Sequence, residues 1–433
     1  MKALLINPPI YDFSAYDLWA KPLGFLYLAD LLSKNGFEIF YFDFLDRNHP
    51  FYERLEKGKK EKYGCGKYFF EVVEKPKIYK DIPRKYKRFG LPERIFMEFI
   101  ENIPVPDFIF ISTGMTYWYP GVVEAVEKCK EYFPNVPIIT GGTYATFCKN
   151  HLSKYRVDFI FSGKNLEKFI YQFNKKFGLN LKYFPSRPKW ELYEKLTYGC
   201  VKTSYGCPFS CAYCGVKILE PVFYQREVKE VVDEILWLKE KFQIKDIAFY
   251  DDALLYNFKN HLEKILKEIE SIDIRFHTPN GLHPRYINKE EVAQILKNSN
   301  FKTIRLSLET VFEERAAESS FKVTFKEFEK TLEYLLKAGF GRDEIGVYIL
   351  AGLPGQSVEE VEKTIRILKN YPVKIKLAEY SPIPGTKDFE IAKKLYPHLP
   401  FNEPLFHNNS IYPLWNFDNK WEKINELKQL IKS

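Results

Sequence analysis

The stretch Cys207–Cys214 reads CPFSCAYC and places three cysteines within eight residues of a 433-residue chain. It follows Val201–Tyr205, a short run of residues that favours a strand. A 4Fe–4S cluster takes four ligands, which are usually cysteine thiolates. Three thiolates on one tight loop leave one iron without a protein ligand, and an open coordination position is typical of a catalytic metal centre. The stretch therefore predicts a cluster held by Cys207, Cys211 and Cys214.

A zinc knuckle or plain thiols would be the alternative interpretation of these cysteines. A structural zinc site needs a fourth Cys or His nearby, and Cys200 is the obvious candidate. The opening residues MKALLINPPI are too short for a signal-peptide core, and no apolar run reaches the length of a membrane span. We therefore expect a cytoplasmic protein in which clustered cysteines bind metal instead of forming disulfides.

Strands alternate with helices after the cysteine stretch. One predicted helix, Glu227–Phe242, carries apolar residues at helical spacing. Together with Val201–Tyr205, six strand–helix repeats predict a partial (β/α)6 barrel over residues 196–390, with its site at the carboxyl-terminal rim. Residues 391–433 would form a C-terminal extension. The five further predicted strands are Asp246–Tyr250, Arg275–Thr278, Thr303–Leu308, Ile345–Leu350 and Lys374–Glu379.

The first part of the chain shows the same alternation. Its predicted helices include Leu23–Lys34, Pro92–Glu101 and Gly121–Tyr132. The pattern predicts an α/β fold with a doubly wound, Rossmann-like parallel sheet over residues 1–182. A linker rich in proline and charge follows at 183–195. The predicted strands of this part are Lys2–Ile6, Phe37–Phe44, Asp107–Ser112, Pro137–Thr140 and Asp158–Phe161.

Small residues stand at the carboxyl ends of these strands, where doubly wound sheets bind their ligands. The ends read Asn7-Pro8-Pro9, Ser112-Thr113-Gly114, Thr140-Gly141-Gly142 and Ser162-Gly163. Side chains of this size would let a large flat ligand approach the backbone closely. The simpler alternative is that they only make tight turns.

The composition, with 45% hydrophobic and 28% charged residues, is that of a globular protein. Nearly all of the net charge of +8 comes from one segment, because Tyr52–Gly90 holds 13 Lys and Arg against 6 Asp and Glu. This basic insertion, 47–95, is either a solvated face or a cap over an anionic substrate or an acidic redox partner. No nucleic-acid motif accompanies the charge, so nucleic acid is not expected. Cys65, within the insertion, has no assigned role.

The Cys-x3-Cys-x2-Cys spacing, with Tyr213 before the last cysteine, resembles the radical S-adenosylmethionine (SAM) superfamily. The resemblance implies that the amino and carboxylate groups of SAM bind the open iron. Reductive cleavage of SAM would give a 5′-deoxyadenosyl radical that abstracts hydrogen from the substrate. The later strand ends also resemble the family's SAM-binding pattern in kind and order, and Gly346–Gly355 resembles its adenine-packing segment. The SAM contacts that this implies are Tyr213, Asp251, Asp252, Asn280, Ser307, Glu309 and Leu350.

The chain as a whole is similar to the cobalamin-binding subclass of that superfamily. Asn7-Pro8-Pro9, Pro22-Leu23-Gly24, Gly141–Thr146 and Ser381–Thr386 match the subclass in kind and order. The Asp-x-His-x-x-Gly motif is absent, so the resemblance implies cobalamin without a histidine ligand, and an acidic stretch of the subclass is here Ser162–Asn165. The implied cobalamin contacts are Asn7, Pro8, Pro9, Gly24, Ser112, Thr113, Gly141, Gly142, Thr143, Tyr144 and Gly163.

The resulting hypothesis is a cobalamin-dependent methyltransferase that acts on an unactivated carbon of a small molecule or peptide. It would be reduced by a protein such as a flavodoxin or ferredoxin. One alternative is a cobalamin-binding radical SAM enzyme that catalyses a non-methylating rearrangement or cyclisation. Another is an iron–sulfur or cobalamin protein that only binds or transfers electrons. The sequence assigns no catalytic residue, although His277 and His283 are either packed side chains or proton acceptors.

Overall fold

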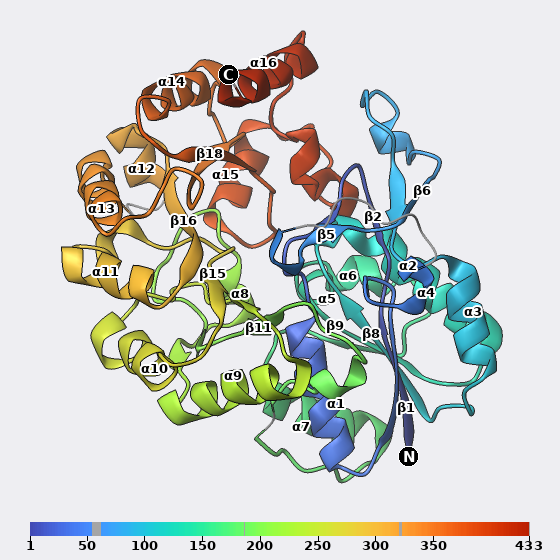
Figure 1. Cartoon of the computed structure of the whole chain (residues 1–433). Coiled ribbons are helices and arrows are strands. Elements are labelled where there is room, and N and C mark those ends of the chain that lie inside the picture. The colour runs from blue at the N-terminus through green and yellow to red at the C-terminus, as the bar shows by residue number, and fades with distance from the viewer. Residues whose placement is uncertain (54–61, 186, 320–322, 433) are drawn as a thin grey trace. The chain divides into compact units, whose positions relative to one another are not determined.

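The computed structural model describes residues 1–53, 62–185, 187–319 and 323–432 (Figure 1). Part of the predicted basic insertion, 54–61, therefore lies outside the described residues. The chain divides into two compact units. The first comprises Met1–Leu196 with Asn402–His407, and the second comprises Thr197–Phe401 with Asn408–Ser433.

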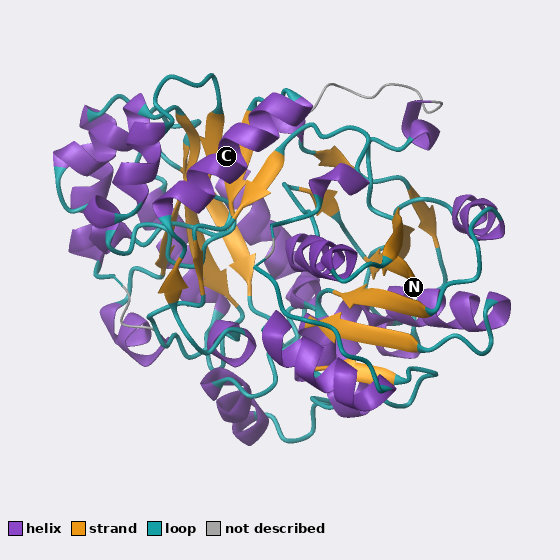
Figure 2. Cartoon of the chain, turned by 90° about the horizontal axis from the view of Figure 1, so that it is seen from below, coloured by secondary structure: helices purple, strands orange, loops and turns teal. Residues whose placement is uncertain are grey.

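The first unit is built on a five-stranded sheet in the order β10-β9-β8-β1-β4, and every pair is parallel. Strand β1 lies inside the sheet because Ala3–Ile6 are fully buried. Helices cover both faces (Figure 2): α1 and α7 pack on one, and α3 to α6 pack on the other. The doubly wound sheet is thus confirmed. The bounds are β1 Lys2–Asn7, α1 Leu23–Lys34, β4 Glu38–Asp43, α3 Glu93–Glu101, β8 Phe108–Thr113, α4 Tyr119–Tyr132, β9 Ile138–Gly142, α5 Thr143–Phe147, α6 Lys149–Leu152, β10 Phe159–Phe161 and α7 Leu166–Phe177.

The described part of the basic insertion is folded against this unit. Its strands pair with β2 and β3, which precede the insertion in the chain, in two small antiparallel sheets with the orders β2-β7-β6 and β3-β5. Arg88 on β7 pairs with Glu124 on α4 at 2.6 Å, and both side chains are largely buried. These strands were not predicted, because two or three residues are too few to show a periodic pattern. The bounds are β2 Ile10–Asp12, β3 Tyr16–Asp17, α2 Pro50–Glu53, β5 Gly66–Lys67, β6 Phe70–Val72, η2 Lys77–Tyr79 and β7 Lys87–Phe89.

A segment from late in the chain completes the first unit. Helix η7 (Pro404–His407) accepts a hydrogen bond from Tyr79 Oη through Leu405 O, at 2.7 Å. His407 Nδ1 lies 3.1 Å from the hydroxyl of Thr116, in η3 (Thr116–Trp118). Tyr79, Leu405, His407 and Thr116 are all buried, so this segment fills a part of the core.

The second unit is built on a six-stranded sheet whose order, β11-β14-β15-β16-β17-β18, is the order of the chain. All neighbouring pairs are parallel. This arrangement confirms the six predicted strand–helix repeats, and β18 has the predicted bounds. The bounds are β11 Gly199–Val201, α9 Val228–Phe242, β14 Asp246–Phe249, α10 Leu262–Glu268, β15 Arg275–His277, α11 Glu290–Asn298, β16 Phe301–Glu309, α12 Glu313–Ser319, α13 Phe325–Lys337, β17 Ile345–Ala351, α14 Val358–Leu368, β18 Lys374–Glu379, α15 Lys387–Leu395 and α16 Lys420–Lys432.

The prediction of one strand over Val201–Tyr205 was wrong. Strand β11 ends at Val201, and β12 (Ser204–Tyr205) pairs antiparallel with β13 (Tyr224–Gln225) outside the barrel sheet. The break occurs because the Asp251 carboxylate accepts hydrogen bonds from the amide of Thr203 and from the Ser204 hydroxyl, at 3.0 and 2.6 Å. In the described residues, no helix has both the length and the apolar character of a bilayer span.

Candidate functional site

The cysteine loop leaves β12 through a turn that only glycine fits well. Gly206 has φ +70°, and a Cβ there would lie 2.6 Å from the carbonyl oxygen of Val222. The Gly206 amide donates to Glu220 Oε2 at 2.7 Å, and the same carboxylate forms a largely buried ion pair with Lys202 at 2.9 Å. Neither Glu220 nor Lys202 was singled out from the sequence, because a lone Lys or Glu gives no local signal.

The middle of the loop is held from both sides. The amide of Ala212 donates to Ser319 O at 2.7 Å, and the amide of Asp388 donates to Ala212 O at 3.0 Å. The ring of Phe209 lies 4.7 Å from that of His283. Of the two interpretations of His283, a packed side chain or a proton acceptor, the structure favours the packed side chain, because its ring supports the loop. His277 is also packed: it is fully buried, and Asp246 and Thr303 bond its two nitrogens at 2.9 and 3.0 Å.

The three cysteines predicted to bind the cluster lie on one loop. Cys207, Cys211 and Cys214 are partly buried, and the amide of Cys214 donates to Cys211 O at 3.1 Å, so the loop is tight. Among the described residues, no three His, Cys, Asp or Glu side chains are placed to hold one metal ion. A cluster does not need such convergence, because each thiolate binds a different iron. No disulfide joins any described cysteine.

Tyr213 connects this loop to the end of β16. Its hydroxyl donates to the carboxylate of Glu309, which is 4% exposed. Burial, followed by the charge of Glu309, raises the pKa of Tyr213 well above its ordinary value, so the hydroxyl stays protonated. Glu309 has φ +75° and follows a register shift between β16 and β17. A non-glycine residue in this conformation is unusual and often marks a functional position.

The two aspartates after β14 have different surroundings. Asp251 is 2% exposed, and its carboxylate accepts hydrogen bonds from Thr203 and Ser204. Asp251 therefore positions the segment that leads into the cysteine loop. Asp252 is partly exposed, and its carbonyl oxygen lies 3.9 Å from Cys207 Sγ. Asn280 is exposed and donates to Tyr250 O at 2.9 Å. A contact of any of these three with SAM stays a prediction.

Ser307 lies close to the turn that contains Asn280. A Cβ on Gly281, which has φ +83°, would lie 2.4 Å from Ser307 Oγ and 3.4 Å from the ring of Tyr348. Glycine is therefore needed for the close approach of this turn to β16 and β17. Leu350, on β17, is partly exposed on the same side of the sheet.

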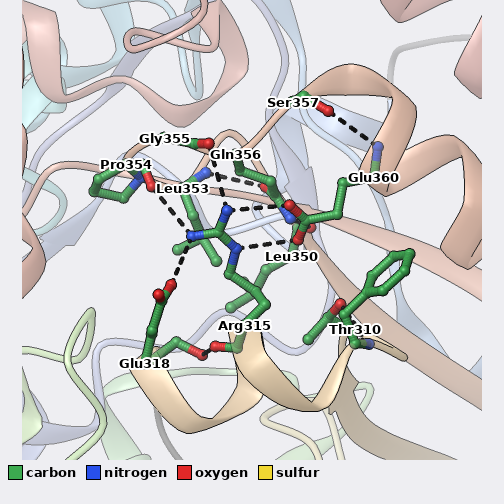
Figure 3. Close-up of polar contacts among 12 residues, drawn as sticks. Thr310, Arg315, Glu318, Leu350, Leu353, Pro354, Gly355, Gln356, Ser357 and Glu360 are labelled. Atoms are coloured by element: carbon green, nitrogen blue, oxygen red, sulfur yellow. Dashed lines mark hydrogen bonds and ion pairs between the residues drawn. The ribbon is translucent and has the colours of Figure 1, made fainter.

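A polar network fixes the loop that follows Leu350 (Figure 3). Gln356 Oε1 accepts from the amides of Gly352 and Leu353 at 2.8 and 3.1 Å, while Gln356 Nε2 donates to Leu350 O at 3.2 Å. Arg315 on α12 forms two hydrogen bonds with the Glu360 carboxylate at 3.1 Å, which gives it a bidentate geometry. Gln356 and Arg315 were not predicted, and they hold the segment expected to pack on adenine.

At the carboxyl end of β1 in the first unit, Asn7 bridges two neighbouring strands. Its amide donates to Asp43 Oδ1 at 2.7 Å, and its oxygen accepts from the Ser112 hydroxyl at 2.7 Å. Pro8 and Pro9 are buried beside Gly121, where a Cβ would lie 1.8 Å from Pro9 O. These residues shape the strand end through tight packing.

The ends of β8 and β9 carry partly exposed small residues. Gly142 has φ +116°, and a Cβ there would meet Thr113 O at 2.3 Å. The Thr113 hydroxyl bonds Gly141 O and the Ala145 amide, both at 3.0 Å. Gly163 faces open space, with no atom within 4 Å of an added Cβ. Gly142 is therefore packed against the end of β8, whereas the backbone at Gly163 is open to a broad ligand.

Three further candidates differ from this pattern. Tyr144 is fully buried, and its hydroxyl lies 2.6 Å from His151 Nδ1, so only its backbone is available at the edge. Thr143 is partly exposed at the start of α5. Gly24 is exposed on α1 with open space around it, so the structure itself does not require glycine there.

The comparison with protein families matches residues 201–368 to the radical SAM superfamily. An uncharacterized methyltransferase of Pyrococcus horikoshii is 28% identical over 200 residues, which cover 45% of this chain and 42% of the relative. The threonylcarbamoyladenosine tRNA methylthiotransferase MtaB of Aquifex aeolicus is 22% identical, covering 64% of this chain and 70% of the relative. This chain thus spans less than half of the Pyrococcus protein.

Two solved structures resemble nearly the whole chain. The radical SAM methyltransferase TsrM of Kitasatospora setae, with tryptophan substrate and a SAM analogue bound, has a TM-score of 0.66 at 14% identity over 92% of this chain and 77% of its own. The cobalamin-dependent SAM radical enzyme OxsB has a TM-score of 0.55 at 12% identity, covering 94% of this chain and 57% of its own. At such identities the likeness establishes the fold. Residues 201–368 therefore form a radical SAM domain, and the chain has an α/β fold similar to those of TsrM and OxsB.

Proposed function

We propose that this protein is a radical SAM enzyme that cleaves SAM at a 4Fe–4S cluster bound by Cys207, Cys211 and Cys214. The observation that carries the proposal is the tight loop of three partly buried thiols within the segment that matches the superfamily. When bound, the cluster and SAM supply an electron and a carbon radical that can abstract hydrogen from an unactivated carbon. All other contributions come from the residues around them.

The chain's own residues would bind and orient SAM. The partly exposed Asp252, next to the cysteine loop, offers acceptors for an ammonium, and Ser307 offers a hydroxyl for a ribose. Gln356 fixes the backbone of Gly352 and Leu353, so that this loop is preorganised for a flat ring. Preorganised groups avoid the entropic cost of ordering at the moment of binding.

We infer that the first unit binds cobalamin along the carboxyl ends of β1, β8, β9 and β10. Support comes from the open space beside Gly163 and from the fold shared with TsrM, whose structure was solved with cobalamin bound. When bound, cobalamin would supply a methyl carrier, which makes methyl transfer to carbon the favoured reaction. Rearrangement or cyclisation without methylation is the alternative, and transfer of labelled methyl from SAM to the product separates the two.

We also propose that an acidic redox protein of the flavodoxin or ferredoxin type reduces the cluster in the cytoplasm. The charge of the basic insertion supports this choice, since Lys67, Lys77 and Lys85 are exposed there. Association between opposite charges weakens as salt shortens the Debye length. Donor-driven turnover should therefore fall between about 0.05 and 0.5 M salt, whereas turnover with dithionite should change little.

The decisive experiment uses protein purified without oxygen, with its cluster restored, in the presence of SAM, cobalamin and dithionite. Formation of 5′-deoxyadenosine and bound cobalamin absorbance are expected, and the Cys207→Ala variant should form none of the nucleoside. Deoxyadenosine without bound cobalamin would remove the methyltransferase proposal. If no deoxyadenosine forms from the loaded protein, an electron-transfer or binding protein becomes the better description.

A further inference from the structure

Arg305 and Lys376 bring two positive charges together on one face of the barrel sheet. Within the sheet, Arg305 on β16 is opposite Gly346 on β17, and Tyr348 on β17 is opposite Lys376 on β18. Ser307, two residues after Arg305, is opposite Tyr348. Since side chains two residues apart point to the same face, Arg305, Ser307, Tyr348 and Lys376 share one face of three neighbouring strands.

The absence of a side chain at Gly346 makes room for this arrangement. A Cβ at that position would lie 2.8 Å from Cδ, 3.0 Å from Nη1 and 3.2 Å from Nε of Arg305. The Arg305 guanidinium therefore lies against the backbone of β17, and its Nη1 donates to Ile304 O at 3.2 Å. It also hydrogen-bonds the Tyr348 hydroxyl, which in turn donates to Pro279 O at 2.9 Å.

The charges around Lys376 disfavour its protonated form. Burial lowers the pKa of Lys376, and the positive charges of Arg305 and Lys374 lower it further. No hydrogen bond or ion pair from a described residue engages its ammonium group, while Lys374 is paired with Asp343 at 2.8 Å. Its side chain remains reachable by water. A lysine whose charged neighbours are both positive is electrostatically unfavourable in the fold, and proteins accept such a cost at binding sites.

We propose that Arg305 and Lys376 form a binding site for the carboxylate or phosphate group of a small-molecule substrate. The planar fork of arginine matches the two oxygens of either group, and the ammonium adds a second positive charge. With strands about 4.8 Å apart, Lys376 lies about 10 Å from Ser307, which is a distance that one small molecule can span. This inference rests on the proposed function, in which Ser307 contacts SAM. It adds the chemical class of the substrate.

The test uses the reconstituted holoprotein with inorganic phosphate as the probe, and the variants Arg305→Met, Lys376→Met and the double variant. Phosphate should raise the melting temperature of the wild type, because a ligand that binds only the folded state stabilises it. The double variant should lose this response and, without phosphate, should melt at the same temperature or higher, since the repulsion is gone. Lys363→Met, which removes an exposed lysine of α14, is the control and should respond as the wild type.

SAM also carries a carboxylate, so a second measurement separates the two sources. The KM for SAM in substrate-free formation of 5′-deoxyadenosine should be unchanged in the double variant. A rise of about tenfold or more would assign the two cations to SAM and overturn the substrate site. If phosphate does not raise the melting temperature of the wild type, and the wild type still forms deoxyadenosine, the site is overturned but the proposed function stands. A double variant that melts well below the wild type would make the pair structural.

Discussion

The hydroxyl of Tyr213, which lies between the second and third cysteines of the loop, donates a hydrogen bond to the buried carboxylate of Glu309. This contact joins the loop to the end of β16 at a residue with φ +75°. The two groups stabilise each other: Tyr213 occupies a carboxylate oxygen that would otherwise be buried without this donor, and Glu309 fixes the ring next to Cys214. The position of the third thiol thus depends on a strand about a hundred residues later in the chain.

Replacing Tyr213 by phenylalanine should therefore destabilise the protein by about 1–3 kcal/mol, because a buried carboxylate loses its donor. Iron and sulfide contents should remain near the wild-type values, since the three thiols are untouched. Denaturant unfolding under anaerobic conditions measures the change. Tyr371→Phe is the matched control: its hydroxyl donates to Glu329 in an exposed pair, so the loss should stay below about 0.5 kcal/mol. Equal losses in both variants would contradict a special role for Tyr213.

Glu220→Gln should impair assembly of the cluster. The substitution keeps the shape of the side chain but removes the charge that pairs with largely buried Lys202 at 2.9 Å. Lys202 keeps Asp252 at 3.9 Å, so the loss should be smaller than the about 3–5 kcal/mol of an uncompensated buried charge. The Gly206 amide would exchange a charged acceptor for a neutral one at the same time. Iron content after reconstitution should fall, whereas Glu426→Gln, in an exposed pair with Lys423, should reconstitute normally. Full iron loading with wild-type stability in Glu220→Gln would refute this role.

Two glycines of the first unit should behave in opposite ways. Gly121→Ala should destabilise the unit strongly, because the new Cβ would lie 1.8 Å from Pro9 O. Gly24→Ala meets nothing within 4 Å and should stabilise α1 by about 0.5 kcal/mol through its better helix propensity. Thermal denaturation measures both. Binding of cobalamin by Gly24→Ala tests the predicted contact at this position, since a ligand resting there would be displaced by the methyl group.

Asp388 should give the stability of the protein a distinct dependence on pH. Burial is the main reason that its pKa rises to about 6 from 3.8. The folded state therefore holds this proton more tightly than the unfolded state, and the contribution of Asp388 to the free energy of unfolding falls as pH rises from about 4 to 6. Asp388→Asn should be more stable than the wild type at pH 7.5, by up to about 2 kcal/mol, and the difference should vanish below pH 4.

Chemical denaturation of the wild type and Asp388→Asn from pH 4 to 8 provides the measurement. Asp273→Asn is a suitable control, because that side chain is exposed and its replacement should leave the pH profile unchanged. If the difference in the free energy of unfolding between the two proteins is constant from pH 4 to 8, the pKa of Asp388 is not raised by folding.

The sequence predicted the long regular elements because their patterns are local. Leu23–Lys34 has helical spacing, and Lys374–Glu379 is bounded by clear turns, so both were placed with the observed bounds. The break after Val201 was missed because it depends on Asp251, fifty residues later. The three cysteines were visible through their spacing, whereas Glu220, Gln356 and Arg305 act through partners that only the folded chain brings near.

The return of Asn402–His407 to the first unit has a consequence for how the protein is made. During synthesis, the barrel strands can pair one after another as they leave the ribosome, because each one lies beside the next in the chain. The first unit, although made earlier, has to wait for a segment that is translated after the whole barrel sheet before Tyr79 and Thr116 gain their partners. The amino-terminal part of the nascent chain thus reaches its final packing only after the whole barrel sheet has been synthesised.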